Sequence, residues 1–335
     1  MSRNATLPVH IAGTGLYAPR TVLTSATLEE RLGLEPGWIA RRTGICERRI
    51  AAPDEAVSDL AVAAGRDALD AAGVSPADVL LVILATSTPD HVLPPTGPAV
   101  AARLGVTSPA FDLAAACSGF LYGVVLASHW LAGPTAHAGS AALVIGANIL
   151  SRRVNWRDRK TAPLFGDGAG AVVLRAAPGE RRGILGLHLA SDGTAWRDIS
   201  VPAGGSRAPV TADALERGEQ FMTMPDGAQL FRRAVRALVH SGEQALNAAC
   251  LGARDLDWFV PHQAGTRLIQ AGADGLGIPA ERVISNVARY GNTSAASIPM
   301  ALHEAVIAGR VRTGDLVLLG AVGGGLTAGA AVLRW

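Results

Sequence analysis

Residues 109–131 read PAFDLAAACSGFLYGVVLASHWL, and this stretch decides the expected fold. It begins as a short strand, turns through small residues around Cys117, and continues as an apolar helix. A second stretch, RVISNVARYGNTSAASIPMALHEAV (282–306), has the same order of strand, small polar turn and helix. Strands that alternate with helices indicate an α/β fold, and the two matching stretches indicate that half of the chain repeats the other half.

The segments around these two stretches also match in pairs. LLVILATSTPDH (80–91) and LDWFVPHQAG (256–265) are each a strand that runs into a polar turn. AALVIGANIL (141–150) and GDLVLLGAVGGG (314–325) are each a strand that ends at small residues. Further buried strands are expected at 9–13 and 170–174, and helices at 58–72, 118–131, 230–248 and 295–308.

The matching pairs keep an almost constant spacing along the chain. Pairing Cys117 with Ser294 gives an offset of 177 residues (294 − 117), and the neighbouring pairs differ little from it. We therefore predict two halves of similar structure, residues 1–180 and 181–335, that join near residues 178–182.

Composition excludes several classes of protein. Hydrophobic residues make up 49% of the chain and charged residues 17%, so a large buried core is expected. The formal net charge of +2 is too balanced for a protein that binds nucleic acid or anionic lipid. Three distant cysteines without a CxxC spacing indicate neither a disulfide framework nor a metal site, and favour a cytoplasmic location. The first residues contain no apolar segment of signal-peptide length.

One uncharged stretch, residues 316–333, is as long as a short membrane span. It contains five glycines, three of them consecutive at 323–325. We interpret it as two buried strands joined by a glycine turn, and we expect no membrane segment.

Cys117 is the candidate nucleophile. It lies between a strand and the start of a helix, where free N–H groups and the helix dipole stabilise a thiolate. Small neighbours would let a substrate approach the sulfur. The alternative is a buried structural cysteine, which is our interpretation of Cys46 and Cys250.

His262 and Asn292 are candidate partners of Cys117. His262 follows a strand end, and Asn292 lies in the turn that precedes the helix of the second repeat. Each has an ordinary structural alternative, a satisfied core histidine and a turn or capping asparagine. The duplication would bring the three together as a nucleophile, a proton-handling group and an amide donor. Residues 323–325 would then offer bare backbone N–H groups for an oxyanion.

At these residues the chain resembles the β-ketoacyl-acyl-carrier-protein synthase III family of the thiolase superfamily. The resemblance covers essentially the whole chain and implies the thiolase fold, two duplicated βαβαβαββ halves in a five-layered α-β-α-β-α arrangement, and a homodimer. The blocks that carry it are WIARRTGICERRI (38–50), AAACSGF (114–120), LFGDGAGAVVL (164–174), VPHQAG (260–265), YGNTSAASIP (290–299) and VGGGLTAGAAVL (322–333).

The resemblance also implies roles for the candidate residues. Cys117 would carry the acyl group, and His262 and Asn292 would stabilise the enolate that forms when the extender unit loses carbon dioxide. The backbone N–H groups of Cys117 and Gly324 would bind the oxyanion.

The substrate contacts implied by the resemblance are mainly basic. Trp38, Arg42 and Arg159 match positions that bind the adenine and phosphates of coenzyme A. Arg232 and Arg267 match basic positions at the tunnel mouth that meet coenzyme A or a carrier protein.

Several positions depart from the family pattern. Gly265 replaces an Asn, Ala228 stands where an Asn often contacts pantetheine, and Asp274 replaces a basic residue. Val322 replaces a bulky Phe, which would widen the substrate pocket, and Leu93 is expected in that pocket through a loop that packs across a dimer. These departures suggest an altered acyl donor or acceptor, as in specialised biosynthesis.

The expected reaction loads an acyl group from acyl-CoA on Cys117, followed by decarboxylative Claisen condensation with a malonyl thioester of a carrier protein or of CoA. Its substrates are acyl-CoA and phosphopantetheine thioesters, and it needs no bound cofactor and no metal. The alternatives are acyl transfer from Cys117 to a hydroxyl or amine without decarboxylation, a papain-like cysteine hydrolase, and a non-catalytic acyl-CoA-binding protein.

Overall fold

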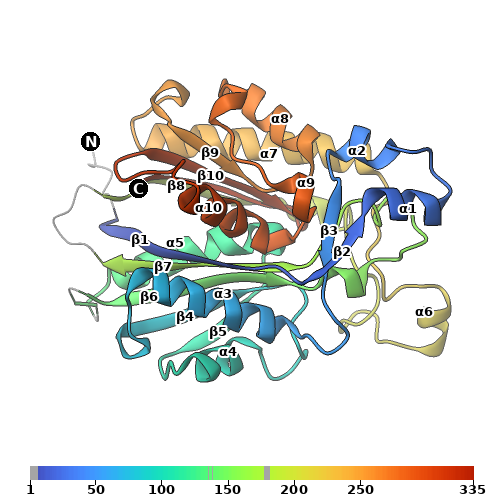
Figure 1. Cartoon of the computed structure of the whole chain (residues 1–335), viewed down its shortest axis with the longest axis horizontal. Helices are drawn as coiled ribbons and strands as arrows, with labels where there is room; N and C mark the ends of the chain where they lie inside the picture. The colour runs from blue at the N-terminus through green and yellow to red at the C-terminus, as the bar shows by residue number, and fades with distance from the viewer. Residues whose placement is uncertain (1–6, 135, 138, 177–181) are drawn as a thin grey trace.

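The structure is a computed structural model that describes residues 7–134, 136–137, 139–176 and 182–335. Its elements form five layers (Figure 1). Helix α3 (Val57–Ala72) covers the outer face of one sheet, and α7 (Gly227–Ala248) covers the outer face of the other. Helices α5 (Gly119–Leu131) and α10 (Ser297–Ile307) lie between the two sheets and contact both. This is the α-β-α-β-α arrangement predicted from the sequence.

The two sheets have related strand orders. The first is β1-β7-β6-β4-β5 and the second is β8-β11-β10-β9. Each sheet contains a parallel pair, β4 with β6 in the first and β9 with β10 in the second. From β6 toward β1, and from β10 toward β8, each strand is antiparallel to the one before it. The bounds are β1 Val9–Tyr17, β4 Val79–Ala85, β5 Ala110–Leu113, β6 Ala141–Asn148, β7 Gly168–Ala176, β8 Gly183–Ser191, β9 Trp258–Pro261, β10 Leu316–Gly323 and β11 Thr327–Arg334.

The second sheet lacks a full counterpart of β5. The strand predicted at the start of the segment 282–306 is reduced to one parallel bridge between Val283 and Phe259 of β9. A 3₁₀ turn, η6 (Ala280–Arg282), precedes that bridge. The prediction of a strand there was therefore wrong in extent, although the segment runs beside β9 as β5 runs beside β4.

Burial on both faces explains the composition of the central strands. Every residue of β6 and of β10 is buried, because helices cover both faces of each sheet. The uncharged stretch 316–333 forms β10, a tight turn and β11, as predicted. No helix in the described part of the chain has the length and apolarity to cross a membrane.

The two halves meet around two short 3₁₀ helices, η2 (Ala116–Ser118) and η7 (Ser294–Ala296). Ala116 and Ser294 begin them, with positive φ angles of 46° and 54°. The structural equivalent of Ser294 is therefore Ala116 rather than Cys117, an offset of 178 residues (294 − 116). The predicted join at residues 178–182 lies, except for its last residue, outside the described residues.

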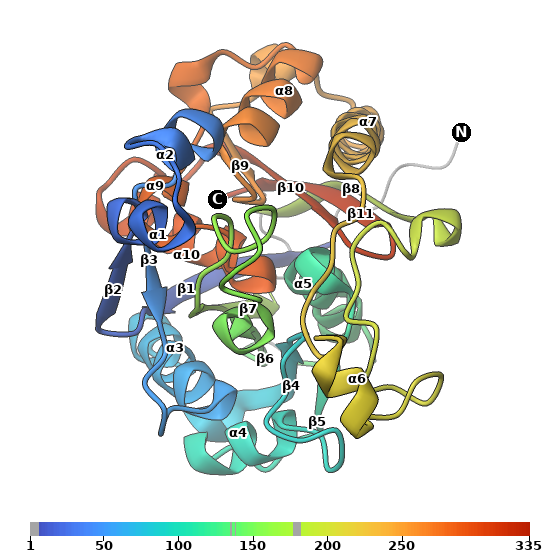
Figure 2. The same ribbon diagram turned by 90° about the vertical axis from the view of Figure 1, so that its right-hand side faces the viewer.

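The remaining elements gather mainly at one end of the molecule (Figure 2). The hairpin β2–β3, helices α1, α2 and α6, and the loops after β4 and β6 all lie there. Helices α4, α8 and α9 flank the two sheets (Figure 1). The bounds are β2 Thr21–Thr24, β3 Glu47–Ile50, α1 Ser25–Leu32, α2 Trp38–Thr43, α4 Gly97–Leu104, α6 Ala212–Glu216, α8 Thr266–Leu276 and α9 Val287–Tyr290.

The prediction that two of the cysteines are buried structural residues is wrong. Cys46 and Cys250 are both exposed. Cys46 directly precedes β3, and Cys250 follows the end of α7 with a φ of 56°. Both lie in connections between elements rather than in the core.

Candidate active site

The parallel strands β4, β5 and β6 direct their carboxyl ends to one edge of the first sheet. Cys117 follows β5 there, in the turn η2 that leads into α5. Active sites of open α/β sheets lie at such edges. Cys117 is half-buried and lines a cavity.

Burial dominates the acidity of Cys117. It raises the pKa of the thiol above its usual value, while a hydrogen bond from Ser294 Oγ and one from the N–H of Cys117 itself lower it. The Ser294 hydroxyl lies 3.4 Å from the sulfur. The sequence suggested that the helix start would favour a thiolate, whereas burial between the elements raises the pKa of the thiol.

Replacing Ser294 by Ala is expected to raise the pKa of Cys117 further, because the thiolate loses a hydrogen-bond donor. The pH dependence of Cys117 alkylation by iodoacetamide, followed by peptide mass, measures this pKa. The midpoint for Cys117 should move upward in Ser294→Ala. A downward shift in that variant would contradict the assigned hydrogen bond.

His262 lies directly after β9 and is 2% exposed. Its Nδ1 is 2.7 Å from Ser297 Oγ, and that oxygen also accepts the Gln263 N–H at 3.3 Å. The arrangement that uses all three groups has the Ser297 hydroxyl donate to Nδ1, which leaves the proton of the neutral ring on Nε2. Burial lowers the pKa of His262 to about 4, so the ring is neutral at pH 7 and can donate from Nε2.

Removing the Ser297 hydroxyl is expected to impair the step that uses His262 and to spare acylation of Cys117. Loss of one hydrogen bond of about 1 kcal/mol predicts a roughly fivefold to tenfold slower second half-reaction. Separate rates of acylation and of carbon dioxide release in Ser297→Ala measure this split. Ser297→Thr keeps the hydroxyl and should recover most of the rate; equal slowing of both steps would mean a general packing defect.

Asn292 presents its amide nitrogen to the same space. Its Oδ1 accepts the Ser294 N–H at 2.8 Å, which fixes the orientation of the side chain and leaves Nδ2 to donate elsewhere. The backbone is held on both sides, because Asn292 N–H donates to Leu164 O at 2.8 Å and Asn292 O accepts the Gly166 N–H at 3.1 Å.

One cavity of about 90 Å³ joins the three predicted residues. Cys117, His262 and Asn292 all line it, together with Val322 and Gly324. A neutral imidazole N–H and an amide N–H thus face the space above a cysteine. Such a set can bind a carbonyl oxygen and stabilise the negative charge that develops on it.

The glycine turn after β10 packs directly against the nucleophile. A Cβ on Gly323 would lie 2.6 Å from the Cys117 N and 3.1 Å from the Ser118 N. Thr327 ties the turn in place, because its hydroxyl donates to Ala115 O at 2.9 Å. This close approach brings Gly324 to the wall of the Cys117 cavity, as an oxyanion donor would require.

A second, more open cavity of about 220 Å³ continues from the first. The two share walls that include Phe165, Leu230 and Asn292, and the outer one reaches Arg42 and Arg267. Arg42 also stacks on Trp38, with 4.5 Å from its Cζ to the ring centroid. A narrow apolar passage that leads from two cations to a cysteine suits a phosphopantetheine arm.

The other predicted contacts lie outside this passage. Arg159 donates to Leu32 O at 2.9 Å and does not line it. Arg232 is exposed on α7. Leu93 is 82% exposed and does not line the Cys117 cavity of its own chain, so its pocket role stays a prediction about a dimer.

Three positions that depart from the family pattern have clear structural settings. Gly265 has a φ of 150°, a conformation that strains other residues, and a Cβ there would lie 3.3 Å from Thr43 O. Ala228 is exposed in the first turn of α7. Asp274 is exposed on α8, where it accepts a hydrogen bond from Gln270.

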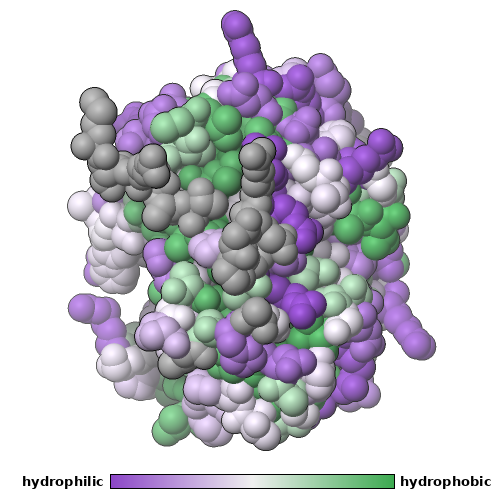
Figure 3. All heavy atoms as spheres, turned by 90° about the vertical axis from the view of Figure 1, so that its left-hand side faces the viewer, coloured by the Kyte–Doolittle hydropathy of each residue, from purple (hydrophilic) through white to green (hydrophobic). Residues whose placement is uncertain are grey.

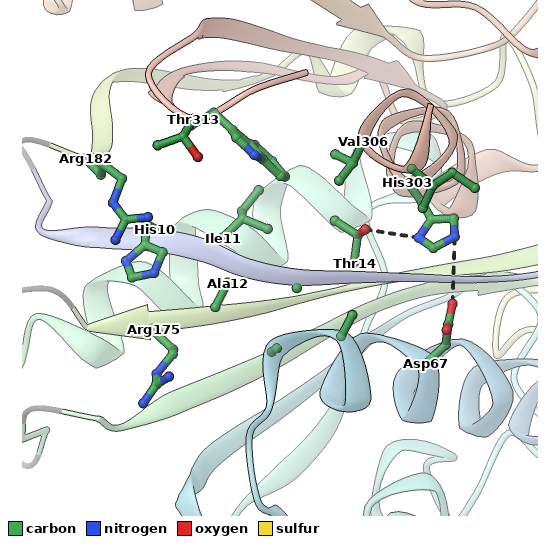
Figure 4. Close-up of a pocket in the computed structure, with 15 residues that line it drawn as sticks. His10, Ile11, Ala12, Thr14, Asp67, Arg175, Arg182, His303, Val306 and Thr313 are labelled. Carbon is green, nitrogen blue, oxygen red and sulfur yellow. Dashed lines mark hydrogen bonds and ion pairs between the residues drawn. The ribbon is translucent and has the colours of Figure 1, made fainter. Parts of the chain in front are cut away.

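Another cavity, of about 530 Å³, lies toward the opposite edge of the sheets, where the C-terminal Trp335 lines it (Figure 4). Its His303 bridges Thr14 Oγ1 at 3.0 Å and Asp67 Oδ2 at 3.8 Å. The face at that end intersperses hydrophilic and apolar side chains (Figure 3). None of the predicted site residues lines this cavity, and the described residues contain no cluster of His, Cys, Asp and Glu suited to a metal ion.

The sequence did not single out Ser294 and Ser297 as site residues. Both lie in the run GNTSAAS, next to Asn292, and both are at most 3% exposed. Small polar residues at a helix start are usually interpreted as caps, so only the contacts with Cys117 and His262 identify them.

Comparisons with known proteins agree with this geometry. Residues 111–193 match the family model described as 3-oxoacyl-[acyl-carrier-protein (ACP)] synthase III, and residues 246–335 match the model of its C-terminal part. A 3-oxopimeloyl-[acyl-carrier-protein] synthase of Rhodothermus marinus is 51% identical over 97% of this chain and 93% of that protein. A β-ketoacyl-[acyl-carrier-protein] synthase III of Symbiobacterium thermophilum is 47% identical over 98% of both chains. The crystal structure of 3-oxoacyl-[acyl-carrier-protein] synthase III from Aquifex aeolicus is 40% identical, with a TM-score of 0.88 over 98% of this chain and 100% of that one.

Proposed function

The chain belongs to the β-ketoacyl-[acyl-carrier-protein] synthase III family of acyltransferases, and from this premise we propose that it condenses an acyl-CoA with a malonyl thioester. The observation that carries the proposal is the shared cavity of Cys117, His262 and Asn292. We also propose that residues 1–180 and 181–335 form two repeated halves and that the protein is cytoplasmic.

In the first half-reaction, Cys117 Sγ attacks the carbonyl carbon of the acyl thioester. The bond between that carbon and the CoA sulfur breaks, and CoA leaves as the thiol with the proton from Cys117. The N–H groups of Cys117 and Gly324 bind the oxyanion of the tetrahedral intermediate. Trp38, Arg42 and Arg159 hold the nucleotide end of CoA, and Arg232 and Arg267 attract its phosphates or an acidic carrier protein.

In the second half-reaction, the malonyl thioester carbonyl accepts hydrogen bonds from His262 Nε2–H and Asn292 Nδ2–H. The bond to the malonyl carboxylate breaks, and its electron pair forms an enolate that both donors stabilise. The enolate carbon then attacks the acyl group, and Cys117 leaves as a thiolate. His262 remains neutral in this step, as its low pKa favours.

A homodimer is part of the proposal because the first sheet ends in an open edge. Strand β5 forms that edge, and Phe111 on it is 39% exposed. Nearby, Val92 is 91% and Leu93 82% exposed. Unpaired strand edges with apolar side chains are templates for pairing with a second chain. The dimer would bring the loop that carries Leu93 to the partner's acyl pocket.

The acyl donor we propose carries a second carboxyl group. The relative from Rhodothermus marinus is named for a 3-oxopimeloyl product, a seven-carbon diacid. Decarboxylative condensation adds two carbons, so such a product requires a five-carbon dicarboxylic donor. At 51% identity, the same class of donor is the best candidate for this chain.

The test is a reaction with acyl-CoA and malonyl carrier protein in which the product and carbon dioxide are both measured. Formation of a β-ketoacyl carrier protein with one carbon dioxide for each product supports the proposal. Transfer of the acyl group to a hydroxyl or amine without carbon dioxide would favour the acyltransferase alternative, and free acid alone would favour a hydrolase.

A further inference from the structure

Glu304 on α10 is a carboxylate that lies outside the Cys117 cavity and makes three hydrogen bonds. Its side chain is 19% exposed. Its Oε1 accepts the hydroxyl of Tyr290 at 2.7 Å, and its Oε2 accepts Asn286 Nδ2 at 3.0 Å and Arg289 Nη2 at 2.6 Å. All three donors come from residues 286–290, so one carboxylate holds this whole segment in place.

The segment that Glu304 holds consists of α9 and the residue before it. Helix α9 is a single turn of 4 residues, which is too short to be stable without contacts to the rest of the protein. Asn286 precedes its first residue and Tyr290 is its last, so the carboxylate reaches both ends of the turn. Burial and the hydrogen bond to Glu304 raise the pKa of Tyr290 to about 12, so its hydroxyl is protonated at pH 7 and donates.

The end of α9 leads directly to Asn292. Gly291, the residue between Tyr290 and Asn292, has a φ of 63°, and a Cβ there would lie 2.8 Å from Leu164 O. A Cβ on Gly166 would likewise lie 2.3 Å from Tyr290 O. The backbone of Tyr290 is therefore packed tightly, while its hydroxyl is held by the carboxylate on α10. Any movement of Tyr290 would be passed through one residue to the amide of Asn292.

The start of α9 is connected to His262 in the same way. Gln263 directly follows His262 and is fully buried. Its Nε2 donates to Pro261 O at 2.7 Å, which fixes the orientation of the amide, and its Oε1 accepts the N–H of Asn286 at 3.0 Å. Asn286 thus contacts Gln263 through its backbone and Glu304 through its side chain. The hydrogen bonds run without interruption from Glu304 to the residue next to His262.

The same face of α10 also supports His262 directly. Ser297, whose hydroxyl lies 2.7 Å from His262 Nδ1, precedes Glu304 by 7 residues (304 − 297), and residues at this spacing share one face of a helix. Helix α10 therefore carries two anchors, Ser297 for the ring of His262 and Glu304 for the turn that leads to Asn292. The distance between the His262 and Asn292 side chains depends on both anchors.

We propose that Glu304 is a positioning residue for the condensation: through Asn286 and Tyr290 it holds Asn292 beside His262, so that both N–H donors meet the same carbonyl oxygen. Two donors stabilise an enolate only if both are fixed at hydrogen-bond distance from its oxygen. Acylation of Cys117 uses other donors, the backbone N–H groups of the oxyanion site, and does not depend on this carboxylate. The inference rests on the proposed condensation and adds to it a residue outside the cavity that sets the geometry of the second half-reaction.

The test measures the two half-reactions separately in Tyr290→Phe and Glu304→Ala. Acylation of Cys117 is followed by intact mass, and carbon dioxide release is followed after the acylated protein is mixed with malonyl carrier protein. Tyr290→Phe loses one hydrogen bond and should release carbon dioxide roughly fivefold more slowly, whereas Glu304→Ala loses three and should be roughly 10–100-fold slower. The rate of acylation should be nearly unchanged in both. Tyr17→Phe is the matched control, because it removes the same kind of hydrogen bond, to Glu55, from the end of β1 and should change neither rate.

The possible failures are distinguishable. Equal slowing of both half-reactions in Tyr290→Phe, equal slowing by Tyr17→Phe, or carbon dioxide release at the normal rate from Tyr290→Phe would overturn the inference and leave the condensation intact. These outcomes decide the inference even if Glu304→Ala does not fold. Absence of carbon dioxide release from the unmodified protein would instead refute the proposed function, and the inference with it.

Discussion

Replacing His262 or Asn292 by Ala is expected to stop condensation while Cys117 is still acylated. Each residue supplies one hydrogen bond to the oxygen that becomes an enolate, and loss of one such donor costs about 3–4 kcal/mol of barrier. Each variant should therefore release carbon dioxide roughly 10²–10³-fold more slowly than the unmodified protein.

Acylation of the same variants provides the control. Cys117 is acylated before the malonyl thioester binds, so intact mass after incubation with acyl-CoA should show the adduct in both variants. The adduct also shows that each variant is folded. Carbon dioxide release at the normal rate from either variant would contradict the role assigned to the pair.

Replacing Gly323 by Ala is expected to damage both half-reactions. The added Cβ would lie 2.6 Å from the Cys117 N, so either the turn η2 or the end of β10 must move. Such overpacking typically costs about 1–3 kcal/mol of stability. Displacement of the Gly324 and Cys117 N–H groups should slow acylation roughly 10²-fold or more.

Gly205→Ala is the matched control, because no heavy atom lies within 4 Å of a Cβ at that position. Thermal unfolding and the rate of acylation should both be nearly unchanged in that variant. If Gly323→Ala acylates as fast as Gly205→Ala, the backbone around Gly323 does not form the oxyanion site.

The sequence could predict the meeting of Cys117, His262 and Asn292 because Cys117 and His262 each follow a strand, and Asn292 lies in the matching turn before the helix of the second repeat. Residues that end parallel strands are brought to one edge by the sheet itself, and the repeat places the two edges face to face. The alternation of strands and helices predicted an α/β fold, and the family resemblance implied its five layers. The roles of the three residues are predictions that the experiments above test.

The supporting contacts could not be predicted in the same way. Ser294 reaches Cys117 only because the two halves pack closely, and Ser297 reaches His262 because α10 packs against β9 within the second half. Gly146 shows how close this packing is, since a Cβ there would lie 2.3 Å from Ala295 O. Burial between the halves raises the pKa of Cys117. The helix start, the feature that is visible in the sequence, predicted a lower pKa instead.

A single turnover of the acylated protein tests the central claim most directly. The protein is first acylated with acyl-CoA, freed of excess substrate, and mixed with malonyl carrier protein, and its intact mass is followed with time. The account predicts an adduct that Cys117→Ala does not form, and loss of this adduct with release of one carbon dioxide for each acyl group. An adduct that persists without carbon dioxide release, or one that still forms in Cys117→Ala, would contradict the account.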